Sequence, residues 1–308
     1  MKMNYIKNSY LLLVLLVLPF IGNTQQFPQF TQYMYNTISV NPAYAGTRER
    51  LNIAFLNRNQ WVGVNGAPVT QTLTADMSIP EANLGVGLSI IYDKLGYENT
   101  TYIYSDLSYT IYMNKDYRLS FGLKAGFSKY GLDPDLLMDP DAFGDQYLDR
   151  IFNKWKPNFG AGIYYRSDDW FMSFSSPRIL SYNNRTEIEY AAIERVSYYF
   201  NGGYMLEFNH HLKFKPTFLL KFTNGAPVSV DLTGNFLIND KLWLGLAYRV
   251  GDALGGLVTL EANKNIKFGY AYEFITNAIN PYTSGSHEIF IIYSFDYPRS
   301  KCDCENKF

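Results

Sequence analysis

Apolar and polar residues alternate along most of this chain with the two-residue period of a β-strand. In residues 119–127 every odd position is leucine, phenylalanine or alanine, whereas the even positions are serine, glycine and lysine. The same division recurs in residues 212–222 and 266–274, and helical spacing is absent from these segments. The pattern therefore predicts strands that have one apolar face and one small or polar face.

Strand length distinguishes a membrane barrel from a soluble sandwich. Several alternating runs extend for about ten residues, which is the length that a tilted strand needs to cross a bilayer. Sandwich strands are usually nearer five or six residues. Glycine is frequent on the polar face, where it costs stability unless backbone or a ligand passes closely, as in a crowded lumen. The glycines concerned are Gly85, Gly87, Gly122, Gly126, Gly160, Gly162, Gly245 and Gly269.

The connections between strands are short at every second gap. Six short connectors lie near residues 80–83, 114–116, 167–169, 209–211, 239–241 and 263–265. Longer stretches at 131–156, 177–194 and 275–284 lie between them. Short turns at one end and long loops at the other are typical of outer-membrane barrels. We therefore predict an all-β fold: a transmembrane antiparallel up-and-down β-barrel of about fourteen strands, with periplasmic termini and an N-terminal segment packed in or under the barrel.

The predicted strands begin near residues 50, 70, 84, 101, 118, 158, 170, 196, 212, 228, 242, 254, 266 and 287. The strands near 170 and 254 have the weakest patterns, and the loss of either would break the even count that places both ends in the periplasm. The lumen charges Lys124, Arg166, Lys213, Lys215, Lys221, Asp231, Arg249 and Glu273 would either pair across the interior or line a pore.

The predicted organisation has four parts. Residues 1–24 combine a positive start with an apolar stretch at 11–20, which indicates a cleaved signal peptide. Residues 25–49 form a plug or rim segment, because their many aromatic side chains would expose a hydrophobic patch on a free tail. The plug could simply close the barrel, or it could offer a docking surface. Residues 50–297 form the barrel, and 298–308 form a periplasmic tail.

The composition supports a location in the outer membrane. Aromatic residues make up 17% of the chain, with Tyr 27 and Phe 22, whereas charged residues are only 18%. Rings with a polar tip suit the two interfaces of a bilayer. The net charge of -1 argues against nucleic acid as a partner.

No catalytic, cofactor or metal site is predicted. The three histidines, His210, His211 and His287, have no nucleophile placed beside them by the sequence. Cys302 and Cys304 lie in the charged tail without a nearby histidine and make a poor zinc site. The acidic run Asp133, Asp135, Asp139, Asp141 and Asp145 could hold a cation, but its prolines and spacing depart from a calcium-binding loop, and a solvated or partner-facing loop is the alternative.

Three segments carry recognisable motifs. The first is Phe30-Thr31-Gln32-Tyr33-Met34-Tyr35-Asn36 with Asn41-Pro42-Ala43-Tyr44-Ala45-Gly46-Thr47. The second is Arg58-Asn59-Gln60-Trp61 with Gly66-Ala67-Pro68, and the third is Gly285-Ser286-His287-Glu288-Ile289. Together they resemble the PorP/SprF family of type IX secretion outer-membrane proteins. The cysteine-bearing end after Arg299 departs from that resemblance.

The resemblance implies an outer-membrane barrel that works with the type IX secretion and gliding machinery. Its implied partners are a secreted adhesin or its C-terminal targeting domain, and the translocon or periplasmic ring components. We expect no enzyme activity and expect the long loops to bind the adhesin, with Tyr147, Phe152, Trp155 and Tyr182 as aromatic anchors. The alternative function is a plugged fourteen-stranded barrel that transports small hydrophobic ligands.

Overall fold

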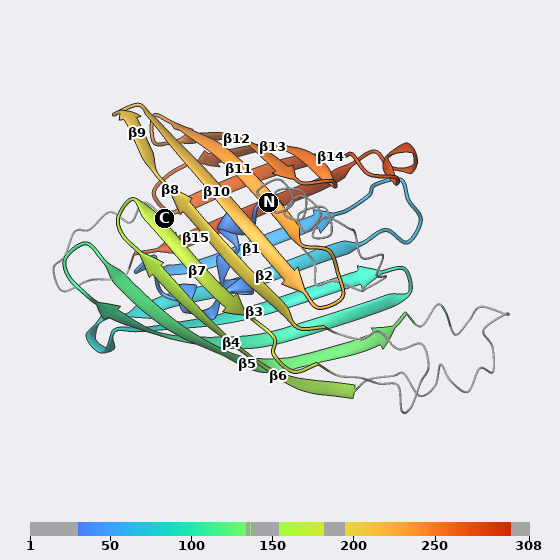
Figure 1. Ribbon diagram of the computed structural model, residues 1–308, viewed down its shortest axis with the longest axis horizontal. Coiled ribbons are helices and arrows are strands. Elements are labelled where there is room, and N and C mark those ends of the chain that lie inside the picture. The colour runs from blue at the N-terminus through green and yellow to red at the C-terminus, as the bar shows by residue number, and fades with distance from the viewer. Residues whose placement is uncertain (1–29, 134–135, 137–153, 182–194, 297–308) are drawn as a thin grey trace, which may run out of the picture.

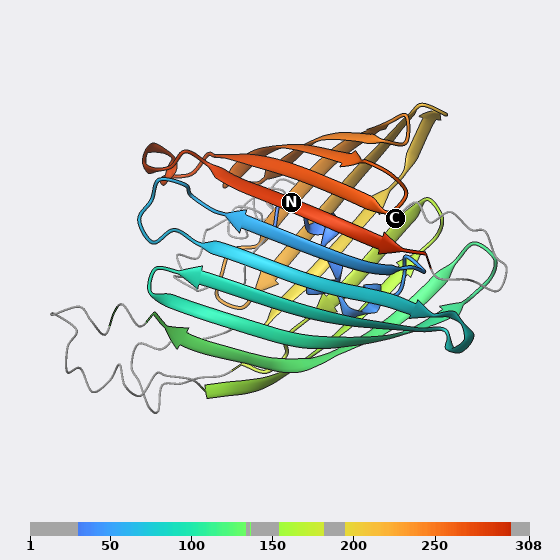
Figure 2. The same ribbon diagram turned by 180° about the vertical axis from the view of Figure 1, so that it is seen from behind.

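The computed structural model describes residues 30–133, 136, 154–181 and 195–296. These residues form one closed antiparallel sheet (Figure 1). Consecutive strands pair in chain order around the wall, and the first strand pairs with the last, so that Leu51 lies opposite Phe295. Figure 2 shows this closing seam from behind, with β15 beside β1.

The strands are β1 (Leu51–Asn59), β2 (Val69–Ile79), β3 (Leu84–Leu95), β4 (Glu98–Tyr112), β5 (Arg118–Leu132), β6 (Lys154–Arg166), β7 (Trp170–Ser176), β8 (Ser197–Tyr204), β9 (Leu206–Asn209), β10 (Leu212–Thr223), β11 (Ser229–Ile238), β12 (Leu242–Arg249), β13 (Ala253–Glu261), β14 (Ile266–Ile275) and β15 (Ser286–Phe295). The helical turns are η1 (Tyr33–Tyr35), α2 (Thr37–Val40), η2 (Pro42–Tyr44), η3 (Pro80–Ala82) and η5 (Asn280–Tyr282). Within the described ranges, no helix is long and apolar enough to span a membrane.

The wall contains fourteen strand positions, because β8 and β9 are two parts of one position that is interrupted at Met205. Pro216 of β10 lies opposite this break. On one side of it β10 pairs with β8, and on the other side it pairs with β9. Proline has no N–H to donate to a ladder, so the sheet is interrupted where the ladder would need one. The predicted fold class is confirmed, including the two strands with the weakest patterns.

Some boundaries differ from the prediction. The ladder between β5 and β6 continues out to Tyr130 and Lys154, so the loop that we expected at 131–156 is shorter at both ends. β4 likewise begins at Glu98, before the predicted start, because it pairs with β3 up to the tight turn at Gly96 and Tyr97. Pairing with a neighbouring strand extends these elements beyond what their own alternation indicates.

The two faces of the wall differ as the alternation predicts. Large apolar side chains such as Leu123, Leu246 and Phe159 are exposed on the outside, by 65%, 68% and 54%. Polar side chains such as Ser89 and Ser120 are fully buried on the inside. An outer belt of exposed leucine and phenylalanine is stable in hydrocarbon, whereas in water it would form an extended hydrophobic patch.

The N-terminal segment, residues 30–47, runs through the lumen and is drawn in dark blue inside the barrel in Figures 1 and 2. Nearly all of its residues are buried, and only Met34 and Tyr35 are half-buried. It contacts strands in turn around the wall, and its partners are Glu288 of β15, Thr217 of β10, Ser175 of β7, Ile163 of β6, Ser108 of β4 and Asp76 of β2. The segment therefore fills the barrel from one side to the other.

Candidate functional site

The turn between Asn41 and Gly46 fixes the end of the segment that leads into β1. Asn41 is extended, with φ -137° and ψ 111°, as expected before a proline. Its side chain accepts a hydrogen bond from Ala43 N at 2.9 Å and donates one to Ile163 O on β6 at 3.1 Å. Gly46 adopts φ +71°, a backbone conformation that favours glycine. The proline and the glycine thus account for the backbone conformation of this turn.

Wall glycines let this turn approach the sheet. A Cβ atom at Gly122 would lie 2.1 Å from Ala43 N, and one at Gly85 would lie 2.0 Å from Ala45 O. At Gly162 it would lie 2.1 Å from the side-chain oxygen of the motif's asparagine. Contacts this short are impossible for an ordinary side chain, so these three wall positions require glycine as long as the segment stays in place. Gly85, Gly122 and Gly162 therefore form a glycine track along which the plug lies against the wall.

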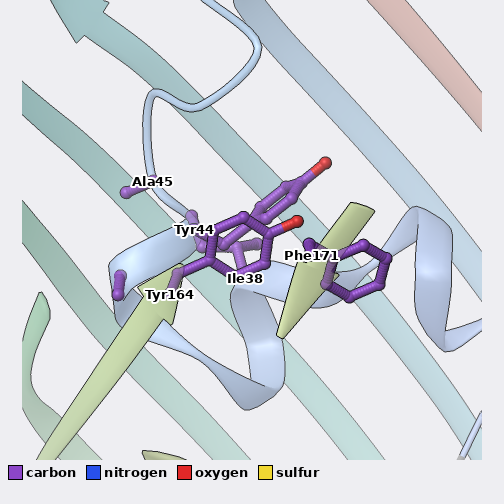
Figure 3. Packing of buried hydrophobic residues seen from close by; sticks show 6 residues of the cluster. Ile38, Tyr44, Ala45, Tyr164 and Phe171 are labelled. Carbon is purple, nitrogen blue, oxygen red and sulfur yellow. The ribbon is translucent and has the colours of Figure 1, made fainter. Parts of the chain in front are cut away.

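Aromatic side chains hold the middle of the segment (Figure 3). The ring of Tyr44 packs edge-on against Tyr164 of β6, with the ring centroids 5.5 Å apart. Tyr164 stacks in turn on Phe171 of β7 at 5.4 Å, and Ile38 belongs to the same buried cluster. Burying these rings removes apolar surface from the water of a polar lumen. The cluster thus fastens the plug to the β6–β7 side of the wall.

At the other end of the segment, a charged cluster joins the plug to β1, β14 and β15. Arg58 forms buried ion pairs with Glu273 and Glu288. Glu288 also accepts hydrogen bonds from the backbone of Thr31 at 2.7 Å and of Gln32 at 3.0 Å. Each of the three sequence motifs contributes a residue to this cluster. The cluster therefore joins residues as far apart in the chain as Thr31 and Glu288.

Other lumen charges also pair, which favours the first of the two alternatives left open by the sequence. Arg249 of β12 donates to Asp231 of β11 at 2.6 Å and lies 3.6 Å from Glu273. Lys124 of β5 lies 2.8 Å from Asp106 of β4 and donates to a plug carbonyl, Ile38 O, at 3.2 Å. A buried charge is costly without a partner. Each pair therefore stabilises the filled lumen only while both of its charged side chains are present.

Tyr33 ties the plug to the opposite wall. Its hydroxyl lies 2.7 Å from Thr217 Oγ1, and its ring packs with Val40, Tyr199 and Leu219. Burial raises the pKa of Tyr33 well above its ordinary value. The phenol therefore stays neutral at any physiological pH. Tyr33, Arg58 and Glu288 all lie in the motifs found in the sequence, but the sequence did not predict that Arg58 and Glu288 pair, because this contact depends on which strands lie side by side.

The first loop, between β1 and β2, contains the second motif. Gln60 N donates to Pro68 O at 2.9 Å, which closes the loop at its base. Trp61 has φ +52°, an uncommon conformation for a bulky residue, and Gly66 has φ +72°. Trp61 N donates to Ser286 Oγ at the start of β15 at 3.2 Å. This loop is therefore held against the last strand of the barrel.

The predicted aromatic anchors fall mostly outside the described residues. Tyr147, Phe152 and Tyr182 lie there, so they remain predictions. Trp155 lies on β6 and not in a loop: its side chain is 49% exposed on the outward face, with the Lys129 ammonium 5.7 Å from its ring. Such a position, near the loop end of the wall, is typical of the aromatic belt at a membrane interface.

Few contacts are observed for the acidic, cysteine and histidine side chains that were considered as metal-binding or catalytic groups. Of the acidic run, Asp133 forms an ion pair with Lys94 at 2.6 Å, and Asp135, Asp139, Asp141 and Asp145 lie outside the described residues, as do Cys302 and Cys304. His287 lies 2.6 Å from the Tyr270 hydroxyl, and His210 and His211 lie in the predicted turn. No group of three acidic, histidine or cysteine side chains suited to a metal occurs in the part of the chain that the structure describes.

Three solved structures match the chain over most of its length at low sequence identity. Outer membrane protein Omp33 of Acinetobacter baumannii has a TM-score of 0.46 at 9% identity, covering 81% of this chain and 100% of that one. The CymD monoaromatic hydrocarbon channel has a TM-score of 0.49 at 11% identity, with 88% and 94% covered. A FadL homologue of Pseudomonas aeruginosa has 0.46 at 12% identity, with 90% and 96% covered.

Among curated proteins, none matches the chain. The family model for the type IX secretion system membrane protein PorP/SprF matches residues 22–293, which is most of the sequence. This match includes all three motifs and every described strand except the last two residues of β15. It follows that this outer-membrane barrel belongs to the PorP/SprF family of type IX secretion system membrane proteins.

Proposed function

We propose that the protein is a non-enzymatic component of the type IX secretion and gliding machinery that anchors a secreted adhesin at the cell surface. In this proposal the loop end binds the adhesin or its C-terminal targeting domain. The short-turn end, where β1 begins and β15 ends, faces the translocon or the periplasmic ring components. The lipid bilayer surrounds the apolar belt.

The filled lumen is the observation that carries the proposal. Residues 30–47 cross the barrel and bind to its wall through hydrogen bonds and ring packing on opposite sides. A barrel closed by its own chain offers surfaces to partners, and a rigid scaffold that presents loops is a common arrangement for binding. Because residues 30–47 occupy the lumen, a hydrophobic solute would have to displace them to pass, and this favours anchoring over transport.

The test is surface retention of the adhesin in cells that carry variants of the barrel. We expect simultaneous alanine substitution of Tyr147, Phe152 and Tyr182 to release the adhesin into the medium, because aromatic side chains concentrate binding energy at interfaces, whereas Trp155 is left in place because it lies on the outer wall. A control variant replaces the exposed Tyr109 and Tyr112 at the opposite end of β4. Folding of each barrel is checked by its heat-dependent mobility in detergent gels.

Retention that persists in cells lacking the whole protein would refute anchoring. Affinity purification from native outer membranes gives a second reading, in which a stoichiometric secreted protein or translocon subunit supports the proposal. Uptake of a hydrophobic solute into liposomes that contain the purified barrel, without any co-purifying secreted protein, would instead support the transport function.

A further inference from the structure

Three loops at the long-loop end are joined to each other by backbone hydrogen bonds. We call residues 60–68, 96–97 and 276–285 the loop platform. Val62 N donates to Gly285 O at 2.8 Å, and Ser284 N donates back to Val62 O at 2.7 Å. Gly96 N donates to Gly66 O at 2.8 Å. The loops after β1, β3 and β14 are therefore one connected surface.

The platform is also fixed at both of its edges. On one side Asp133 N donates to Tyr97 O at 2.7 Å, and on the other Thr276 N donates to Asp252 O at 2.8 Å. Asn277 adds a side-chain bond to Asp252 at 2.6 Å. Loops held in this way lose little conformational entropy when a partner binds, which is the main advantage of a preorganised surface.

Trp61 provides an independent sign of function in this surface. Its positive φ of 52° is strained for a tryptophan, and the surrounding bonds hold it in place. Strain of this kind is retained where a particular local shape is needed. The side chains around it are exposed: Tyr282 by 74%, Tyr97 by 51% and Val62 by 36%.

The chemistry of the platform restricts its partner. All three of its segments lack lysine, arginine, aspartate and glutamate, and they are rich in asparagine, glycine, threonine and tyrosine. A polyanion such as the phosphorylated sugar of a lipid would require arginine or lysine, and a cation would require carboxylates. Tyrosine with small polar residues is instead the composition of antibody loops, where rigid rings supply contact area and small residues supply adaptable hydrogen bonds.

We propose that the loop platform is the docking surface for a folded protein domain with an uncharged contact face, namely the targeting domain of the secreted adhesin. This assignment rests on the proposed anchoring function and adds where the domain binds. Tyr282 and Tyr97 are the central contacts, and Val62 with its neighbours excludes water around them.

The test places a photoreactive phenylalanine analogue at position 97 or 282 of the full-length protein in native outer membranes. Tyr112 is a matched control, because it is a tyrosine at the other end of β4 with 52% exposure against 51% for Tyr97. After irradiation, adducts are identified by mass spectrometry. Adducts from positions 97 and 282, but not from 112, to peptides of a secreted protein's C-terminal domain support the proposal.

No adduct, an adduct with lipopolysaccharide or another barrel, or equal adducts from position 112 would overturn it. In parallel, we expect Tyr97→Ala with Tyr282→Ala to weaken binding on the order of 10- to 100-fold, as for interface aromatic residues, while Tyr112→Ala has no effect. Surface retention that depends on the barrel but not on these two tyrosines would reject the platform and leave anchoring intact. Surface retention that depends neither on the barrel nor on these two tyrosines would reject anchoring itself.

Discussion

Substitution of Gly122 by alanine should loosen the plug without disturbing the wall. The added methyl would lie 2.1 Å from Ala43 N and 2.4 Å from Pro42 C, both backbone atoms that cannot move aside alone. Ordinary contact begins at 3.4 Å, so the turn must shift by about 1.3 Å. Overpacking of this kind typically costs about 1–3 kcal/mol. Because Gly122 points into the lumen, the cost acts on plug docking and not on the strand ladder.

The assay measures how often the plug leaves its place. Ser39, which is 3% exposed in α2, is replaced by cysteine in a chain whose two natural cysteines are serine. The rate of labelling by a hydrophilic maleimide then reports the undocked population. A cost of 1–3 kcal/mol corresponds to about a 5- to 150-fold faster rate. Gly256→Ala is the matched control, because a Cβ there meets nothing within 4 Å.

Equal labelling rates in the Gly122→Ala and Gly256→Ala variants would refute this account of the glycine track. A rate that rises equally in both would mean that any added methyl destabilises the barrel. A rise confined to Gly122→Ala, with unchanged heat-dependent gel mobility, is the expected result.

Three further substitutions test other contacts. Arg58→Met leaves Glu288 buried without a cation and Glu273 with Arg249 alone, and we expect it to lower the free energy of unfolding by about 3–5 kcal/mol in denaturant titrations; changing Glu288 to glutamine as well should restore most of this loss. Asn41→Ala removes the bonds to Ala43 N and Ile163 O, a loss of about 1 kcal/mol that should speed maleimide labelling in the plug, and Asn41→Asp should be no milder, because its buried carboxylate would face Ile163 O. Asn158→Ala removes the acceptor of two backbone N–H groups in the segment after β7, so chymotrypsin should cut there roughly tenfold faster, and an unchanged rate would contradict this role.

The sequence by itself determined the features that depend on neighbours along the chain. The two-residue alternation decides which side chains face lipid, because successive residues of a strand point to opposite faces. The asparagine-rich connectors decide where the chain reverses. Glycines on the polar face indicated that backbone passes close to the wall, and proline after Asn41 set an extended conformation. For these reasons the barrel, its strand number and the buried N-terminal segment were predictable.

Only the tertiary structure decided which distant residues meet. Closure of the barrel places β1 beside β15, and this brings Arg58 within reach of Glu288 although 230 positions separate them. Alternation carries no information about such partners. Likewise, Trp155 belongs to a strand because β5 offers it a pairing edge, and the loop platform exists because three loops reach the same height on adjacent strands. Pairing and closure, which are global properties of the sheet, determined the sites that local patterns could only suggest.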